Sequence, residues 1–486
     1  MIGLLIQDNA YEQDIRELLM SFYPGETYAH EVKEGVDFYV QTRLEDGEAV
    51  IGIWEKLENG EELEGWTLTA HSTGKADLSD HSATKNVIKK LFYQMLVKRT
   101  GHELPWGSLT GIRPTKIALS RLEDGWKEED IRKFMKETYM TSDEKINLSI
   151  EIAAREKRLL EPLDYDRGYS LYVGIPFCPT TCLYCSFTSY PISKWKGRTG
   201  LYLEALFKEL EYTAEKMKGR PLDTIYFGGG TPTSLPAEDI DAILCKLEQL
   251  FDTKNALEFT VEAGRPDSIT EEKLKVLASH GISRISINPQ TMNQKTLDLI
   301  GRRHTVENVK EKFHIARELG FDNINMDLIM GLPGENLDDV KHTLEEIEAL
   351  KPDSLTVHSL AIKRAARLNM FKEEYADLKI NNTPEMTALS EACARRMGME
   401  PYYLYRQKNM AGNFENVGYS LPGKACIYNI LIMEEMQTIA ACGAGTTTKV
   451  VFPSENRRER CENVKEVEQY ISRIDEMIGR KEKIIH

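Results

Sequence analysis

Long apolar runs are missing from this sequence of 486 residues. No uninterrupted run approaches the roughly 18 apolar residues that a membrane-spanning helix needs. The first residues, MIGLLIQDNAYEQD, also lack the charged region and the cleavage site of a signal peptide. We therefore expect a cytoplasmic protein without a membrane span.

An excess of positive charge is missing as well. Lysine and arginine together number 62, aspartate and glutamate 77, and the formal net charge at pH 7 is −15. A balance of this sign repels phosphate groups, so nucleic acid is not the expected partner. The fractions of hydrophobic (41%) and charged (29%) residues are ordinary for a globular protein, and they exclude collagen-like and wholly disordered chains.

Cysteine is scarce and unevenly distributed. Eight cysteines are too few for a disulfide scaffold in a chain of this length. Three of them, Cys178, Cys182 and Cys185, fall within eight residues. Because free cysteine is commonly a small buried hydrophobic residue, we expect the other five to be structural. These five are Cys245, Cys393, Cys426, Cys442 and Cys461.

Residues 1–165 differ in pattern from the rest of the chain. The alternating segments DFYVQTRL and AVIGIWEKL are separated by EDGE, and an Asp-Gly pair between such segments predicts a β-hairpin. From Lys85 onward the pattern becomes helical. We expect a small α/β unit followed by helices, a domain to which no chemistry is assigned.

Residues 166–375 alternate between short strand-like runs and amphipathic stretches of helical length. The runs are SLYVGI, DTIYFGG, EFTVEA, RISINPQ, NINMDLIMG and SLTVHSLAI. Such alternation predicts βαβ units and a parallel sheet with helices outside it. The expected fold class is α/β, a partial (β/α)6 barrel, and an open doubly wound sheet is the alternative. Residues 376–486 are expected to form a C-terminal cap and a helical tail.

The unusual residues of the predicted barrel lie where its strands end. In βα barrels the chemistry collects at the carboxyl ends of the strands, because the loops there can vary without disturbing the core. These ends carry the cysteine triple, Gly228–Pro232, Glu262, Gln290 and Asp327. We expect them to converge on one face.

The triple Cys178-x-x-x-Cys182-x-x-Cys185 directly follows the first barrel strand. Four thiolates would saturate a [4Fe–4S] cluster, whereas three leave one iron open to a small ligand. A structural zinc site normally closes with four protein ligands. The spacing therefore favours an iron–sulfur cluster, with structural zinc and unligated core cysteines as alternatives. Three aromatic residues of the loop are expected to screen the cluster from water: Phe177, Tyr184 and Phe187.

This cysteine spacing after the first strand of such a barrel resembles the radical S-adenosylmethionine (radical SAM) superfamily. The segments YVGIPFC, FGGGTPT, ISINPQ, IGRRHT and NMDLIMGLPGE resemble the branch that contains the oxygen-independent coproporphyrinogen III oxidases (coproporphyrinogen dehydrogenases) and the radical SAM haem chaperones. The segments ELPWGSLTGIRPTK and HSLAIKRAARL resemble the dehydrogenase variant with a longer N-terminal domain.

The resemblance implies two cofactors, a [4Fe–4S] cluster on the three cysteines and S-adenosylmethionine on its open iron. Cleavage of the sulfonium would yield methionine and a 5′-deoxyadenosyl radical. The side-chain-free backbone of Gly229 and Gly230 suits close approach to the methionine amino group. Glu262 and Asp327 suit hydrogen bonds from ribose hydroxyls or the ammonium group. The further expected cofactor contacts are Tyr172, Thr231, Gln290 and Arg302.

The resemblance also implies a reaction, the oxidative decarboxylation of two propionates that converts coproporphyrinogen III to protoporphyrinogen IX, with an unidentified electron donor. A substrate with four carboxylates needs cationic anchors. The candidates are Lys363, Arg364, Arg367 and Arg406.

Two departures leave the substrate open. The best-known coproporphyrinogen dehydrogenases carry a further cysteine where this chain has Phe187, and the haem chaperones carry an aromatic residue there. The loop 413–419 lacks the His-Asn and Tyr-Trp pairs of the chaperones and is nearer the dehydrogenase form. A coproporphyrinogen oxidase, a haem-delivery chaperone and a radical SAM enzyme for another tetrapyrrole are therefore the three hypotheses.

Overall fold

The computed structural model describes residues 1–56, 65–187, 189–361, 366–370, 380–407 and 414–485. The chain divides into two compact units, and the division falls within one helix, between Ala154 and Arg155. The first unit comprises Met1–Ala154 together with Arg406 and its neighbour Gln407, and the second holds most of the rest. No helix of the described residues is both long and apolar enough to cross a membrane.

The first unit contains a five-stranded sheet in the order β2-β1-β3-β4-β5. The predicted hairpin is confirmed, because β3 and β4 pair antiparallel up to Glu45 and Glu48. Asp46 and Gly47 between them both have positive φ, as a two-residue hairpin turn requires. The strands are β1 (Ile2–Ile6), β2 (Tyr28–Ala29), β3 (Phe38–Glu45), β4 (Glu48–Lys56) and β5 (Trp66–Lys75).

Helices complete the first unit. The apolar faces of α1 and α2 pack with one face of the sheet, around residues such as Leu4, Phe92 and Leu96. The Asp80 side chain caps the first turn of α2, and Gly101 ends this helix in the left-handed conformation. The helices are η1 (Asn9–Tyr11), α1 (Glu12–Phe22), α2 (His81–Thr100), α3 (Thr115–Glu123), α4 (Glu128–Tyr139) and α5 (Asp143–Leu160), which continues into the second unit.

The second unit is built on six parallel strands whose spatial order follows their order in the chain. A doubly wound sheet would reverse its strand order at a switch point, so this alternative is excluded and the partial (β/α)6 barrel is confirmed. The strands are β6 (Tyr169–Ile175), β9 (Leu222–Gly229), β10 (Glu258–Gly264), β11 (Arg284–Ile287), β12 (Ile324–Met330) and β13 (Ser354–Ser359).

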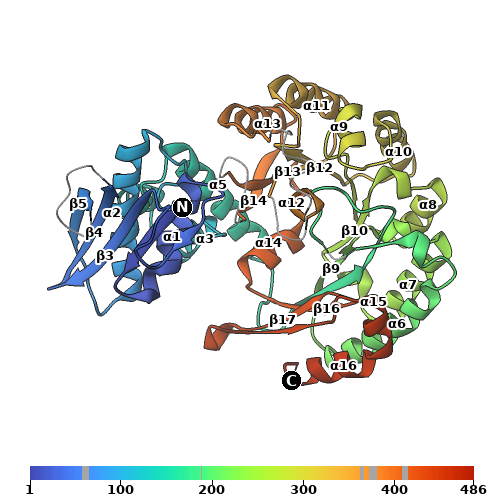
Figure 1. Cartoon of the computed structure of the whole chain (residues 1–486). Coiled ribbons are helices and arrows are strands. Elements are labelled where there is room, and N and C mark those ends of the chain that lie inside the picture. Colours follow the sequence, from blue (N-terminus) through green and yellow to red (C-terminus); the bar gives the residue numbers. More distant parts are fainter. Residues whose placement is uncertain (57–64, 188, 362–365, 371–379, 408–413, 486) are drawn as a thin grey trace. The chain divides into compact units, whose positions relative to one another are not determined.

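Amphipathic helices connect these strands and cover the outer side of the curved sheet (Figure 1). They are α6 (Thr199–Lys216), α7 (Ala237–Leu250), α8 (Glu271–Ser279), α9 (Gln294–Leu299), α10 (Val306–Glu318) and α11 (Leu337–Leu350). Side-chain caps begin several of them, for example the capping box of Thr305 and Asn308 before α10. Short elements in the loops are β7 (Phe177–Cys178), β8 (Tyr190–Pro191), η2 (Ile192–Lys194), η3 (Pro232–Ser234), η4 (Thr253–Asn255), η5 (Pro266–Ser268) and α12 (Arg367–Met370).

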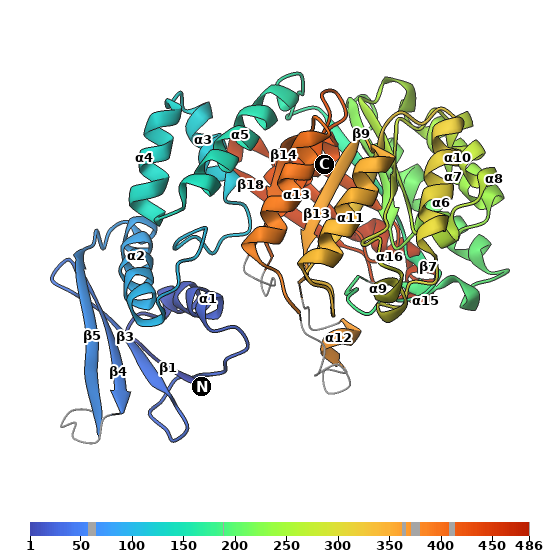
Figure 2. The ribbon, with the colours of Figure 1, turned by 90° about the horizontal axis from the view of Figure 1, so that it is seen from above.

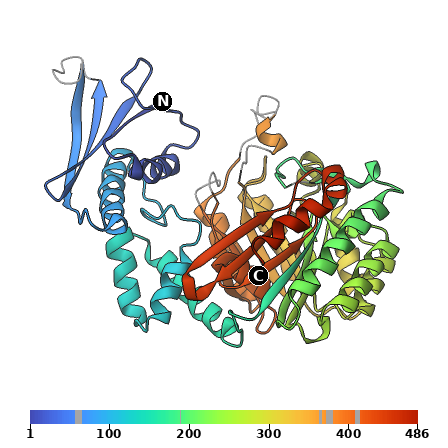
Figure 3. The ribbon, with the colours of Figure 1, turned by 90° about the horizontal axis from the view of Figure 1, so that it is seen from below.

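The C-terminal part, expected as a cap, extends the sheet itself at both edges. On one side β15 (Asn416–Ser420) pairs antiparallel with β13, followed by β14 (Glu400–Tyr405). On the other side β16 (Thr438–Cys442) pairs parallel with β6, followed by β17 (Thr447–Phe452) and β18 (Arg457–Glu462) (Figure 3). The result is an open sheet of eleven strands in the described residues.

The remaining C-terminal elements are helical. Figure 2 shows α13 (Pro384–Arg396) beside α11, and α14 (Ile427–Glu434) follows β15 in the chain. A 3-10 turn, η7 (Pro453–Glu455), joins β17 to β18. The expected helical tail consists of α15 (Val467–Ser472) and α16 (Ile474–Glu482), which pack on α6.

Candidate functional site

The three clustered cysteines lie in the loop that follows β6. Cys178 and Cys182 are buried and Cys185 is partly exposed. Their sulfur atoms do not form a set in which all lie within 4.8 Å of one another, among the residues that the structure describes. A single zinc ion with Zn–S bonds of about 2.3 Å would need a more compact set. Three thiolates that each bind a different iron of a cluster do not need to be so compact.

Polar groups surround these thiols. The Thr231 hydroxyl oxygen lies 3.4 Å from Cys178 Sγ, and Arg265 Nη1 lies 3.4 Å from Cys182 Sγ. Arg265 is only 4% exposed, and Asp267 holds its guanidinium through two hydrogen bonds of 2.9 and 2.6 Å. Hydrogen bonds and positive charge near the sulfur atoms of a cluster stabilise its negative charge and tune its potential.

Burial keeps two of the thiols protonated at neutral pH. It raises the pKa of Cys178 above its usual value and that of Cys185 to about 11. Since a thiolate is the form that binds metal, loading the site displaces these protons.

The glycine segment after β9 lies directly against the cysteine loop. The Gly230 N–H donates to the Ile175 carbonyl and the Thr231 N–H to that of Phe177, both at 2.7 Å. A Cβ atom on Gly230 would lie 2.6 Å from the Phe177 carbonyl oxygen and 3.0 Å from Cys178 Sγ. Gly229 has a φ of +114°. Side chains are therefore excluded at both positions, which leaves exposed backbone beside the thiols.

Glu262, at the end of β10, accepts a 2.6 Å hydrogen bond from the Tyr226 hydroxyl. Burial raises the pKa of Glu262 to about 7, and the charge of Asp327 adds to this effect. Tyr172 stacks on Tyr226 and on Tyr428, with ring centroids 6.0 Å apart in each pair. The structure thus places Tyr172 in a stack of tyrosines that also holds the Glu262 carboxyl group.

Asp327 and Gln290 are joined through the backbone. Gln290 has a φ of +69°, its N–H donates to the Asp327 carbonyl at 2.9 Å, and its own carbonyl accepts from the Ile329 N–H at 3.0 Å. Asn325 donates to the Asp327 carboxylate at 2.7 Å, and His358 Nε2 lies 3.8 Å from it. Burial opposes ionisation of Asp327, but its interactions with His358 and Asn325 outweigh this and lower its pKa.

Arg302 is 5% exposed and donates from Nη1 to the Asn288 carbonyl. The next buried residue, His304, is neutral, because burial and the Arg302 charge lower its pKa to about 3. Several buried polar atoms of this region have no hydrogen-bond partner within the described residues. They are Ser286 Oγ, Asn288 Oδ1, Gln290 Oε1, Arg302 Nε and both ring nitrogens of His304.

Such a concentration of unsatisfied buried groups is costly unless a ligand satisfies them. The residues present therefore fit a polar cofactor with hydroxyl, amino and carboxylate groups, held between the thiols and the ends of β9 to β12.

Two expectations are wrong. Phe187 does not screen the cysteines, because its side chain is 71% exposed; Phe177 is fully buried. Cys245 is exposed on α7, whereas the other four scattered cysteines are buried. Arg406, a candidate substrate anchor, is buried and donates to the Leu109 carbonyl at 2.7 Å.

The other candidate anchors lie in or near the segment after β13. Arg367 is exposed at the start of α12. Lys363 and Arg364 lie outside the described residues. The same holds for Asn413, the first residue of the loop 413–419.

Sequence reasoning missed Arg265, Ser286, Asn288 and His358. Arg265 directly follows Gly264 at the end of β10. Its position after a barrel strand was the one feature of the sequence that could have marked it as a site residue. Ser286, Asn288 and Gln290 alternate in the chain, so the two-residue period of a strand could have placed them on one side. His358 shares a strand with five other residues, and nothing in the sequence distinguishes it.

Comparison with known proteins agrees with this geometry. The model of the radical SAM superfamily matches residues 172–347. The "oxygen-independent coproporphyrinogen-III oxidase-like protein HemZ" of Bacillus subtilis is 40% identical, over 99% of this chain and 96% of its own length. The chain belongs to the radical SAM superfamily, among the coproporphyrinogen III oxidase-like proteins. Members of this superfamily use a [4Fe–4S] cluster and S-adenosylmethionine.

Other relatives cover less of the chain. The "heme chaperone HemW" of B. subtilis is 38% identical over 40% of this chain and 51% of its own. The "oxygen-independent coproporphyrinogen III oxidase" of Escherichia coli is 32% identical over 40% of this chain and 42% of its own. The solved structure of the E. coli enzyme shares the fold, with a TM-score of 0.52 and 24% identity over 64% of this chain and 70% of that one.

Proposed function

We propose that the protein is a radical SAM oxidoreductase that converts coproporphyrinogen III to protoporphyrinogen IX without oxygen. The observation that carries the radical SAM chemistry is the three-thiol loop beside the backbone of Gly229 and Gly230, here called the glycine ridge, and a group of unsatisfied buried polar atoms. The choice of substrate is supported by the HemZ relative, which matches almost the whole chain.

In this proposal Cys178, Cys182 and Cys185 hold the cluster. Once bound, the cluster and S-adenosylmethionine supply the radical that removes a hydrogen atom from a propionate. Each of two propionates then loses CO2 and one further electron and becomes a vinyl group. The chain itself has to position the reactants, balance their charge and exclude water.

Individual residues divide this work. The bare backbone of Gly229 and Gly230 lets the amino-acid part of the cofactor approach the thiols. Arg302 presents a buried guanidinium to a carboxylate, and Gln290 presents its side-chain oxygen to a donor. Glu262 and Asp327 accept hydrogen bonds from ribose hydroxyls, and Tyr172 forms part of the wall that excludes water.

Arg265 has a separate part in the proposal. Its guanidinium, fixed by Asp267, faces Cys182 Sγ and remains charged, so it offsets the negative charge that a reduced cluster gains. An arginine is suited to this position because it cannot lose its proton in a buried site.

A haem-delivery chaperone is the second candidate. Phe187 favours it, because the chaperones carry an aromatic residue at this position, and the HemW relative supports it over the matched part of the chain. The 71% exposure of Phe187 presents a large apolar ring next to the cysteine loop, a feature suited to contact with an apolar macrocycle.

Anaerobic incubation of the cluster-loaded protein with coproporphyrinogen III, S-adenosylmethionine and a reductant separates the candidates. Vinyl-bearing product and CO2 are expected for the oxidase. Stoichiometric haem binding without product would support the chaperone. Cleavage of S-adenosylmethionine only when haem is present would instead indicate an enzyme acting on another tetrapyrrole.

A further inference from the structure

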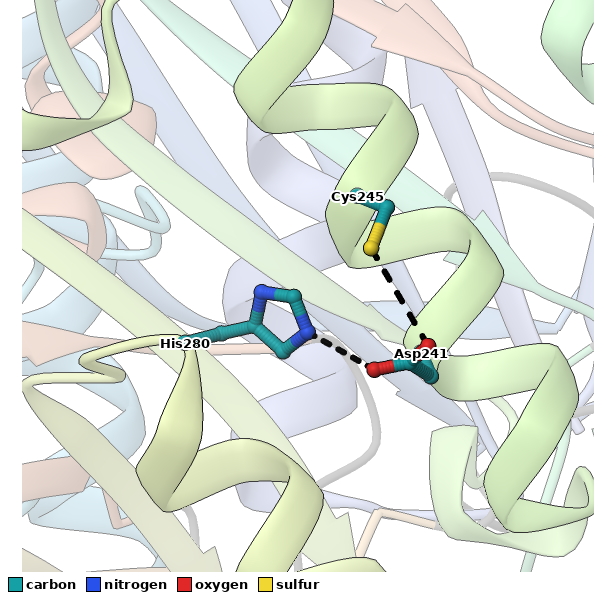
Figure 4. Close-up of side chains that lie close together, drawn as sticks. All are labelled: Asp241, Cys245 and His280. Atoms are coloured by element: carbon teal, nitrogen blue, oxygen red, sulfur yellow. Dashed lines mark hydrogen bonds and ion pairs between the residues drawn. The ribbon is translucent and has the colours of Figure 1, made fainter.

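A second group of side chains of the types that bind metals lies on the outer surface of the barrel. Asp241 and Cys245 are one helical turn apart on α7, so they share one face of that helix. His280 follows the last residue of α8 and reaches towards the helix that carries them (Figure 4). One ligand atom from each residue lies within 4.8 Å of the other two.

This group is separate from the cysteine loop. The chain leaves the site face at the end of β10, runs through α8, and reaches His280 shortly before β11 begins at Arg284. His280 therefore lies at the amino-terminal end of the strands, and the thiols lie at the carboxyl-terminal end. A ligand bound at one site cannot be the ligand of the other.

The hydrogen bonds within the group orient the imidazole. His280 Nε2 lies 2.9 Å from Asp241 Oδ1, and Nδ1 lies 2.8 Å from Glu248 Oε1. Cys245 Sγ lies 4.0 Å from the other oxygen of Asp241. A carboxylate on the far nitrogen of an imidazole is the arrangement that fixes a metal-binding histidine, because it holds the proton on that nitrogen and frees the other.

We propose that Asp241, Cys245 and His280 bind one Zn2+ ion, with Glu248 as the positioning residue for the imidazole. A thiolate and an imidazole select zinc over magnesium and calcium, which prefer oxygen ligands. Three protein ligands leave the fourth tetrahedral position to water or to an external group. The ion takes the place of the direct contact between His280 Nε2 and Asp241, and it links α7 to the turn after α8.

The test uses the full-length protein with its iron–sulfur cluster loaded, so that the three clustered cysteines are occupied. Zn2+ is titrated against a chromophoric chelator, and zinc and iron are counted after desalting. We expect one zinc per chain in addition to the iron. Cys245→Ser and His280→Gln should each weaken zinc binding at least tenfold, and Glu248→Gln should weaken it by about 10- to 100-fold through loss of orientation.

Cys461→Ser is the matched control, because it removes another free cysteine that is not in the group, and it should bind zinc as the unchanged protein does. Zinc should also raise the thermal unfolding midpoint of the unchanged protein and of the control, but not of Cys245→Ser. Equal zinc binding by the unchanged protein and by Cys245→Ser, at equal iron content, would overturn the proposal. So would the absence of zinc from the cluster-loaded protein.

Discussion

Two buried polar clusters in the second unit differ in whether their hydrogen-bonding atoms have partners within the protein. At Glu209 both carboxylate oxygens are used: Lys481 Nζ and Asn463 Nδ2 donate to Oε1, and Tyr470 and the Gly443 N–H donate to Oε2. The single atom of these partners that lacks a hydrogen bond within the described residues is Asn463 Oδ1. In the cluster around Gln290, five residues including Gln290 keep buried polar atoms without a partner among the described residues. A satisfied cluster fixes architecture, because its donors and acceptors match within the fold. An unsatisfied one is prepared for a ligand.

The location of each cluster agrees with this difference. The Glu209 cluster joins α6 to the C-terminal helices and strands on the outside of the sheet. The Gln290 cluster lies among the ends of β11 and β12, beside the glycine ridge and the cysteine loop. Substitutions in each cluster test this difference, and the effects expected on the cofactor rest on the proposed function.

Loss of a cluster cysteine should have the largest effect. Cys182→Ala removes one of three proposed ligands, so iron content and brown absorbance after anaerobic reconstitution should fall to background. Circular dichroism should show an unchanged fold, since alanine keeps the Cβ atom and removes only one small side-chain atom. An unchanged absorbance would show that the loop does not hold the cluster.

Disrupting the hydrogen-bonded cluster around Glu209 should lower the free energy of unfolding without affecting the binding of the iron–sulfur cluster. Glu209→Gln keeps the shape of the side chain but leaves the buried Lys481 ammonium without its counter-charge. Denaturant titration should show a loss of about 3–5 kcal/mol in the free energy of unfolding. Iron content after reconstitution should equal that of the unchanged protein. A stability within about 0.5 kcal/mol of the unchanged protein would contradict the structural role of this cluster.

A methyl group on the glycine ridge should disturb the thiols next to it. In Gly230→Ala the new Cβ would lie 2.6 Å from the Phe177 carbonyl oxygen, so the cysteine loop has to shift. We expect at least a tenfold loss of S-adenosylmethionine affinity, measured by equilibrium dialysis of the reconstituted protein. Gly200→Ala is the matched control, because a Cβ there meets nothing within 4 Å, and it should bind normally.

Removing an unsatisfied polar group should weaken binding without weakening the fold. Gln290→Leu deletes a buried oxygen that no described residue satisfies, so stability should stay within about 1 kcal/mol of the unchanged protein or rise. S-adenosylmethionine affinity should fall about tenfold, the equivalent of one lost hydrogen bond. A large loss of stability with normal S-adenosylmethionine binding would show that Gln290 supports the fold and does not bind the cofactor.

The pH dependence of binding should show the smallest effect. The pKa of Glu262 is raised to about 7, from 4.5 in an unperturbed carboxyl, so the folded state retains a proton that the unfolded chain loses. Stability from this group is therefore lost as the pH rises from about 4.5 to 7. Affinity for the sulfonium cation should rise a few-fold over pH 6–8 as the carboxylate forms. Glu262→Gln should give a flat profile, and a sloping one would assign the titration to another group.

Local patterns in the sequence predicted the parts of this fold that depend on near neighbours. The Asp46-Gly47 hairpin, the six parallel strands and the position of the cysteine loop all follow from turn chemistry, strand-helix alternation and spacing. The pairing of β16 with β6 joins residues more than 250 positions apart, and no local pattern records such a contact.

The site divides in the same way. Residues with a motif of their own, such as Gly230 beside Cys178, are found together in the structure. Arg265 could not be identified, because its role depends on a contact with Cys182 from another loop. Phe187 and Cys245 were misjudged for a related reason: residue type predicts average burial, but the exposed face of a particular loop or helix is set by tertiary packing.

The most direct test of the site is electron paramagnetic resonance of the reconstituted, reduced protein with and without S-adenosylmethionine. A cluster held by three cysteines has an iron with open coordination, so addition of the cofactor should change the spectrum of the reduced [4Fe–4S] cluster. The same addition to Gly230→Ala should change it less. A reduced cluster whose spectrum is identical with and without the cofactor, or a protein that takes up no iron, would contradict the central claim.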